Sequence, residues 1–149
     1  MGFRELPHAV GRGLFAGVVG TAAITASTMI QMKIRDQGPS SAPAEATEEL
    51  LNVHPDSEED RQRLSSVVHW GYGTMWGAAR GVIGAFGGRG ATATALHFGA
   101  VWGNALWMLP TLRVAAPVTE WGGKEVAIDG FNHLIYALAT NLAYERMSS

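Results

Sequence analysis

Residues 13–32 read GLFAGVVGTAAITASTMIQM and contain no charged residue, no histidine and no proline. A helix of about 20 residues, at 1.5 Å per residue, matches the roughly 30 Å hydrocarbon layer of a membrane. Residues 91–112 likewise contain no Asp, Glu, Lys or Arg, whereas acidic residues gather between Asp36 and Asp60. Because charge is excluded from whole blocks and not only from one helix face, the pattern indicates membrane spans.

Four blocks of about 20 mainly apolar or small residues fit the chain as membrane spans. They are residues 13–32, 66–87, 91–112 and 127–144. We therefore predict an all-α polytopic membrane protein that crosses the bilayer four times. Residues 1–149 would form a single membrane domain, with a polar, acidic loop at residues 33–65.

The fourth block is the most polar of the four, since it carries Asp129, Asn132, His133 and Asn141. We expect it to insert with its polar face against the other helices. The alternative is a water-soluble all-α bundle. It is disfavoured because glycine inside a helix costs about 1 kcal/mol relative to alanine in water, and many of the 19 glycines lie in these blocks.

Two connections have their own signals. Residues 43–53 predict a short helix whose apolar edge, Leu50, Leu51 and Val53, lies on the membrane surface or covers the bundle. Asp56 or Ser57 can cap the next helix, so the second span is expected to begin outside the membrane. Residues 87–90 read GGRG and allow only a tight turn, which predicts an antiparallel hairpin of the second and third spans.

Composition excludes several functions. The chain has no cysteine, so disulfides, thiolate metal sites and cysteine nucleophiles are absent. A net charge of −2 predicts no nucleic-acid surface. The sequence also contains no nucleophile elbow and no zinc-protease motif, so we expect no enzymatic activity.

A short repeat links the second and fourth blocks. His69-x-x-Tyr72 recurs as His133-x-x-Tyr136, which is consistent with a two-plus-two repeat whose copies run parallel and place both histidines at one depth. Such a pair could ligate haem or a metal, although histidines near helix ends are more often interfacial hydrogen-bonding residues. His97 is expected near the opposite surface, outside this pair.

Small residues mark the expected helix contacts. Gly73, Gly77 and Gly81 follow His69 at steps of four, so another helix can approach this stripe closely. Gly99 and Gly103 predict a second such contact. Arg80 and Glu145 are expected at similar depth and could form an ion pair, the alternative being that Arg80 extends its charge to the membrane surface.

The chain resembles the YagU-like family of bacterial inner-membrane proteins, which is defined by sequence and has no established biochemical role. The residues that carry the likeness are Gly17-Val18-Val19, His69, Met108-Leu109-Pro110, Pro117 and residues 125–133. The resemblance implies a bacterial cytoplasmic membrane and favours cytoplasmic termini. It implies no substrate, and the long acidic segment after the first span departs from the family pattern.

Three functions follow as hypotheses. The first is a non-catalytic integral membrane protein without a cofactor, which contacts membrane lipids and either forms a homo-oligomer or serves as an accessory subunit beside other membrane-protein subunits. The second is a small transporter or channel with a polar path that includes His69, Asn104, His133 and Asn141. The third is a redox protein with haem or a metal bound at His69 and His133.

Overall fold

The chain folds into helices alone over the part that the computed structural model describes, residues 5–36, 38 and 42–148. The helices are α1 (Leu6–Arg35), α2 (Ala42–Leu51), α3 (Glu58–Ala85), α4 (Gly90–Thr111) and α5 (Gly123–Arg146), with a 3₁₀ turn, η1 (Val118–Glu120), before α5. These described residues contain no β-strand, so the predicted all-α class is confirmed.

The long helices α1, α3 and α5 extend beyond the blocks that predicted them, because local capping sets their ends. Ser57 caps α3, and its Oγ accepts a hydrogen bond from the amide of Asp60 at 3.1 Å. Helix α1 has Pro7 in its first turn and ends where Asp36 takes a left-handed backbone conformation with φ of 52°. The apolar blocks in the sequence predict only the part of each helix that would match the hydrocarbon layer. The helices themselves are longer because they continue to their capping residues.

The segment at residues 33–65 contains the predicted short helix and the predicted early start of the next helix. It contains the end of α1, all of α2 and the first two turns of α3. Of the apolar edge predicted for α2, Leu50 and Val53 do not cover the bundle, the side chain of Leu51 lies outside the described residues, and contact of this edge with the membrane surface stays a prediction. Leu50 and Val53 are 60% and 45% exposed, whereas Ala44, Ala46 and Thr47 are buried. Small side chains face inward because α2 packs directly on α3.

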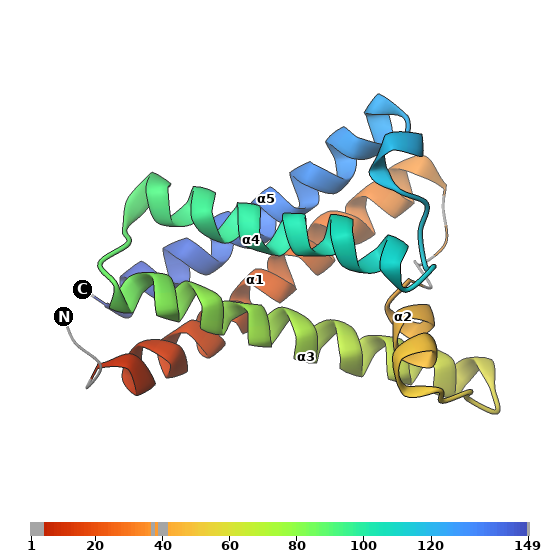
Figure 1. The fold of residues 1–149 in the computed structure, drawn as a ribbon, viewed down its shortest axis with the longest axis horizontal. Helices are drawn as coiled ribbons and strands as arrows, with labels where there is room; N and C mark the ends of the chain where they lie inside the picture. Colours follow the sequence, from red (N-terminus) through yellow and green to blue (C-terminus); the bar gives the residue numbers. More distant parts are fainter. Residues whose placement is uncertain (1–4, 37, 39–41, 149) are drawn as a thin grey trace.

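The four long helices form an up-and-down bundle in which α1 lies beside α3 and α5, and α4 completes the ring (Figure 1). The closest packing is between α1 and α3, followed by α1 and α5. Figure 1 shows that the helices converge near the chain termini and spread apart toward the end that carries α2. The turn at residues 86–89 joins α3 and α4 as the predicted antiparallel hairpin.

Glycines bring the backbones of α1 and α3 into contact. A Cβ on Gly77 would lie 2.6 Å from the Cα of Gly17, and one on Gly81 would lie 2.8 Å from the Cα of Val10. A Cβ on Gly13 would in turn lie 2.9 Å from the Cα of Gly81. Real Cβ atoms essentially never approach so closely, so this crossing requires glycine.

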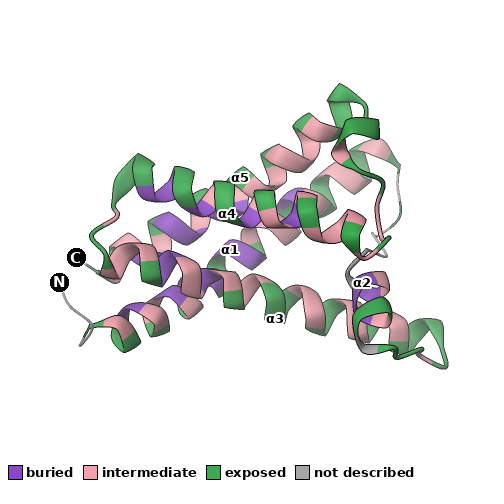
Figure 2. Cartoon of the chain, in the orientation of Figure 1, coloured by how far each residue is buried: buried purple, intermediate pink, exposed green. Residues whose placement is uncertain are grey.

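Burial is reversed relative to a water-soluble bundle. The buried residues are mostly alanine, glycine and threonine, and the largest fully buried side chains include Arg80, Tyr136 and His97. Large apolar side chains instead point outward, such as Ile34 at 78% and Phe86 at 75% exposure. Figure 2 shows buried residues on the inner sides of the long helices and on part of α2.

One helix among the described residues, α1, is long and apolar enough to cross a membrane by length and composition. Core helices of water-soluble proteins and signal sequences pass the same test, but only 28% of the apolar window of α1 is buried. Helices α3, α4 and α5 are long enough and fall short on composition. The polar residues of these three helices, and their glycines and threonines of near-neutral hydropathy, lower the mean hydropathy of each helix. A count of charged residues alone does not reveal this.

Candidate functional site

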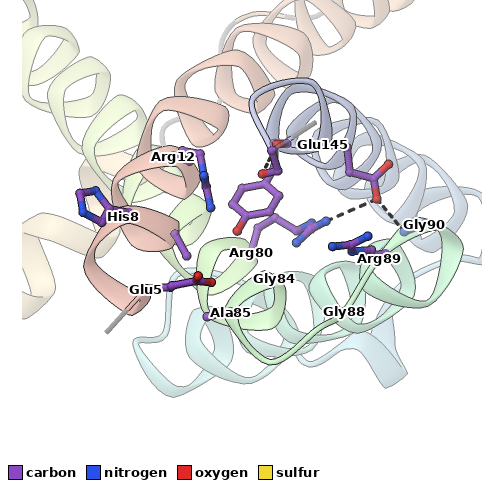
Figure 3. A pocket seen from close by; sticks show the side chains of 13 residues that line it. Glu5, His8, Arg12, Arg80, Gly84, Ala85, Gly88, Arg89, Gly90 and Glu145 are labelled. Carbon is purple, nitrogen blue, oxygen red and sulfur yellow. Dashed lines mark hydrogen bonds and ion pairs between the residues drawn. The ribbon is translucent and has the colours of Figure 1, made fainter. Parts of the chain in front are cut away.

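A cavity lies at the end of the bundle where α1 begins, α3 turns into α4 and α5 ends. It has a volume of about 640 Å³, and we call it the arginine cavity (Figure 3). Three arginines line it, namely Arg12, Arg80 and Arg89, together with His8, Glu5, Tyr144 and Glu145. Gly84, Ala85 and Gly88 add little side-chain bulk, which leaves the space open.

Arg80 is fully buried and is held from two sides by α5. Its Nε donates a hydrogen bond to Oδ1 of Asn141 at 2.7 Å, and its guanidinium lies 4.2 Å from the centroid of the Tyr144 ring. Its Nη2 lies 3.5 Å from Oε1 of Glu145, so the predicted Arg80–Glu145 pair is present. Neither Nη1 nor Nη2 has a hydrogen-bond partner.

Sequence reasoning missed the other members of the cavity. The guanidinium of Arg12 lies 5.8 Å from the same Tyr144 ring, and its buried Nε has no hydrogen-bond partner. Glu145 also accepts a hydrogen bond from the amide of Gly90 at 2.6 Å, which ties the end of α5 to the start of α4. Arg12 directly precedes Gly13, the first glycine of the α1–α3 contact. Its place in the sequence was therefore a signal that Arg12 lies close to the end of α3 and to Arg80.

The two predicted histidines have separate partners. Nε2 of His69 lies 2.9 Å from Oγ1 of Thr25, whose own hydroxyl proton is donated to the carbonyl of Thr21. His69 must therefore donate through Nε2, so its Nδ1 is the unprotonated nitrogen of the neutral ring. His133 donates through Nδ1 to the carbonyl of Asp129 at 2.9 Å.

No hydrogen bond or ring contact joins His69 to His133 among the residues that the structure describes. A shared ligand would have to take Nδ1 of His69 and Nε2 of His133, the nitrogens that these bonds leave. Haem or metal binding by this pair stays a prediction. In the described ranges, no group of three or more His, Asp or Glu side chains is placed to hold a metal ion.

His97 lies inside the bundle, and its position near the opposite membrane surface stays a prediction. Its side chain is fully buried, its Nε2 donates to the carbonyl of Trp76 at 3.0 Å, and its ring lies 5.5 Å from that of Tyr136. The hydroxyl of Tyr136 donates to the carbonyl of Gly73 at 2.6 Å. Small residues on α1 and α3 allow these rings to meet at the centre.

The other predicted polar residues form helix-to-helix hydrogen bonds. Asn104 donates to the hydroxyl of Tyr72 at 2.6 Å and joins α4 to α3. The side-chain oxygen of Asn141 accepts a hydrogen bond from Arg80, which joins α5 to α3. Three residues of the predicted polar path, His69, Asn104 and Asn141, thus join helices in separate pairs, whereas His133 bonds within α5.

The predicted glycine stripes behave differently from one another. Gly73, Gly77 and Gly81 face α1, and a Cβ on Gly73 would lie 3.1 Å from Cγ2 of Thr21. Gly99 and Gly103 are a correction for the single chain, since a Cβ at either position would meet nothing within 4 Å. Both are exposed on the outer face of α4 because its inner face carries Ala93, His97 and Val101.

The fold and the cavity together define an all-α bundle with an arginine-lined cavity at one end. No protein-family model, no curated protein and no solved structure matches the chain.

Proposed function

We propose that this chain is a non-catalytic integral membrane protein whose four long helices cross the bilayer and which acts as a building block of a larger membrane assembly. The observation that carries the proposal is the reversed burial. Arg80 and His97 are fully enclosed, whereas Ile34, Phe86 and Met75 are 78%, 75% and 71% exposed.

The energetics of this arrangement favour lipid over water. Leaving a large apolar side chain exposed in water forgoes about 1.5–3 kcal/mol relative to burying it, and the outer surface exposes such side chains on every long helix. The same side chains contact hydrocarbon favourably in a bilayer. Polar side chains in a membrane are expected to face the bundle interior and pair with one another.

The lower hydropathy of α5 fits this proposal because its polar residues are paired inside. Asn132 exchanges hydrogen bonds with Gln31 at 2.9 and 3.0 Å, and Ser27 donates to Oδ1 of Asn132 at 2.8 Å. Asp129 accepts a 2.7 Å hydrogen bond from the indole of Trp102. Four spans with both termini on one side follow if α3, α4 and α5 insert in this way.

The outer face of α4 supports assembly. Ala91, Ala95, Gly99 and Gly103 follow one another at steps of four and are all exposed. In lipid, small-residue stripes of this kind let a second helix approach closely, and packing drives helix association there. The partner is either a second copy of this chain or a span of another subunit.

The cellular location and the orientation of the chain are part of the proposal. The resemblance to the YagU-like family supports a bacterial cytoplasmic membrane with cytoplasmic termini. Under this proposal the arginine cavity lies on the cytoplasmic side, where basic residues near the ends of spans are favoured.

Two variants test the proposal in membranes and in mild detergent. Gly103→Leu should leave the thermal unfolding temperature of the purified protein unchanged and abolish its oligomer or its co-purifying partner, whereas Leu138→Ala on the outer face of α5 should retain the assembly. Wild-type protein should stay in the membrane fraction after alkaline carbonate extraction. Release by carbonate would contradict the membrane location, and assembly retained in Gly103→Leu would contradict the α4 interface.

A transporter or channel is the second candidate, and the arginine cavity is the observation that favours it. A cavity of about 640 Å³ that is open at one end of the bundle could be the entrance to a path. Anion flux into liposomes that contain the protein, lost in Arg80→Lys, would support this function over the building-block role.

A further inference from the structure

We infer that the arginine cavity binds a phosphate group, supplied either by the headgroup of an anionic phospholipid or by a soluble phosphate compound. Three guanidinium groups, those of Arg12, Arg80 and Arg89, line one cavity and come from α1, α3 and the α3–α4 turn. Figure 3 shows Arg80 and Arg89 directed toward the same part of the cavity, with Arg12 entering from α1.

Arg80 supplies the strongest observation. Its side chain is fully buried, yet Nη1 has no partner among the described residues, and Nη2 has the 3.5 Å ion pair with Glu145 but no hydrogen bond. Asn141 and the Tyr144 ring fix the guanidinium plane, so the two terminal nitrogens are presented in one orientation. A buried donor without a partner costs free energy, and a ligand oxygen in the cavity would remove this cost.

The charges of the cavity leave room for an anion. Three arginines face two glutamates, Glu5 and Glu145, so one positive charge remains with His8 neutral. Glu145 is already engaged by Arg80 and by the amide of Gly90. Among the described residues, neither Arg12 nor Arg89 forms an ion pair with a carboxylate.

The chemistry of guanidinium selects the ligand class. Its planar donors match two oxygens of a phosphate at once, which a single ammonium group does not. Because Arg80 and Arg89 are directed toward the same part of the cavity, they can contact several oxygens of one tetrahedral group, and Arg12 adds a third positive charge to the lining from α1. A flat surface of mobile lysines would give attraction without this geometry.

The position of the cavity also suits a lipid headgroup. It lies at the end of the four spans, next to the turn at residues 86–89, where headgroup phosphates are found in the proposed orientation. Phe86 lies between the cavity-lining Ala85 and Gly88 in the chain and is 75% exposed, which offers an apolar contact for an acyl chain. The lipid source rests on the membrane location proposed above, whereas a soluble phosphate compound does not.

The test uses the full-length protein, purified in mild detergent and delipidated. Native mass spectrometry would count bound phosphatidylglycerol and phosphatidylcholine, and thermal unfolding would be followed with inorganic phosphate against chloride at equal ionic strength. Arg12→Gln and Arg89→Gln alter half-buried and exposed side chains, so both should fold. Arg63→Gln removes the same charge at the opposite end and is the matched control.

We expect Arg12→Gln and Arg89→Gln each to weaken binding at least about tenfold, and Arg63→Gln to bind as wild type. Preference for phosphatidylglycerol over phosphatidylcholine without protection by inorganic phosphate identifies a lipid, and protection by inorganic phosphate identifies a soluble compound. Arg80→Lys keeps the charge and should still weaken binding, because it lacks the planar donor pair.

Two results would overturn the inference. One is wild-type protein that neither retains phosphatidylglycerol above phosphatidylcholine nor gains stability from inorganic phosphate above chloride. The other is an equal loss in Arg63→Gln and Arg89→Gln, which would reduce the effect to overall charge. Carbonate extraction reports the membrane location separately, so its failure is distinguishable from a failure of phosphate binding.

Discussion

Glycine at positions 13, 17, 77 and 81 allows the backbones of α1 and α3 to touch, and this contact places the buried polar residues. With the two backbones so close, the rings of Tyr136 and His97 fill the remaining centre from α5 and α4. The stripe at Gly73, Gly77 and Gly81 could be recognised from its spacing alone. The matching positions on α1 could not be recognised, because Gly13 and Gly17 lie in a block with small residues on all sides.

Gly77→Ala should therefore destabilise the bundle, because its Cβ would meet the backbone of Gly13 and Gly17, which cannot move without separating the helices. We expect a loss of about 1–3 kcal/mol, the usual cost of overpacking, measured by thermal or denaturant unfolding in detergent. Gly103→Ala is the matched control, since its Cβ would meet nothing within 4 Å. Equal stability of the two variants would show that α1 and α3 do not touch at Gly77.

The histidines show why side-chain partners are harder to predict than helices. Helices α3 and α5 run in the same direction, as the H-x-x-Y repeat suggested (Figure 1), and the hydrogen bond from Tyr136 to the Gly73 carbonyl places Tyr136 at the level of the residue after Tyr72. It gave no information about Thr25, which lies on a third helix and binds His69. The partner of a buried polar group depends on the rotation of each helix about its axis, and short repeats do not fix that rotation.

At the scale of elements, blocks of mainly apolar or small residues located the four long helices, and capping at Ser57 and Asp36 marks where α3 begins and α1 ends. The start of α3 was predictable because Ser57 and the acidic residues after it form a recognisable N-terminal signal. The inward face of α2 was not predictable. Its attachment depends on Arg61, whose Nε donates to Oε1 of Glu48 at 2.8 Å and whose Nη2 lies 3.7 Å from Glu45.

The hydrogen bond to Glu48 raises the pKa of Arg61 above its ordinary value, because it stabilises the charged guanidinium. Arg61→Gln should thus loosen α2 from α3 and accelerate amide hydrogen exchange in α2 by about two- to fivefold, a modest change because the pair is partly exposed. Arg63→Gln is the control, since Arg63 pairs only with Glu59 and Asp60 on its own helix. Equal acceleration in both variants would mean that the Glu48 pair does not hold α2.

At the scale of the whole molecule, the direction of the helices distinguishes four spans from one. If α1 alone crossed the membrane, everything after it would lie on one side. With four spans, cysteines introduced as Gln62→Cys and Ser148→Cys should react with a membrane-impermeant maleimide from opposite faces of intact cells or inverted vesicles. Both positions are exposed in the structure. Labelling of both from the same face would contradict the four-span topology.

The central place of α1 has a consequence for biogenesis. This helix leaves the ribosome before both of its principal neighbours, α3 and α5. If the proposed four spans form, α1 is the helix among the described residues whose length and composition suit insertion by itself. Once inserted, it would offer the side chains of Thr25, Ser27 and Gln31 as hydrogen-bonding partners to the later helices. Insertion of those more polar helices would then depend on the presence of the first span.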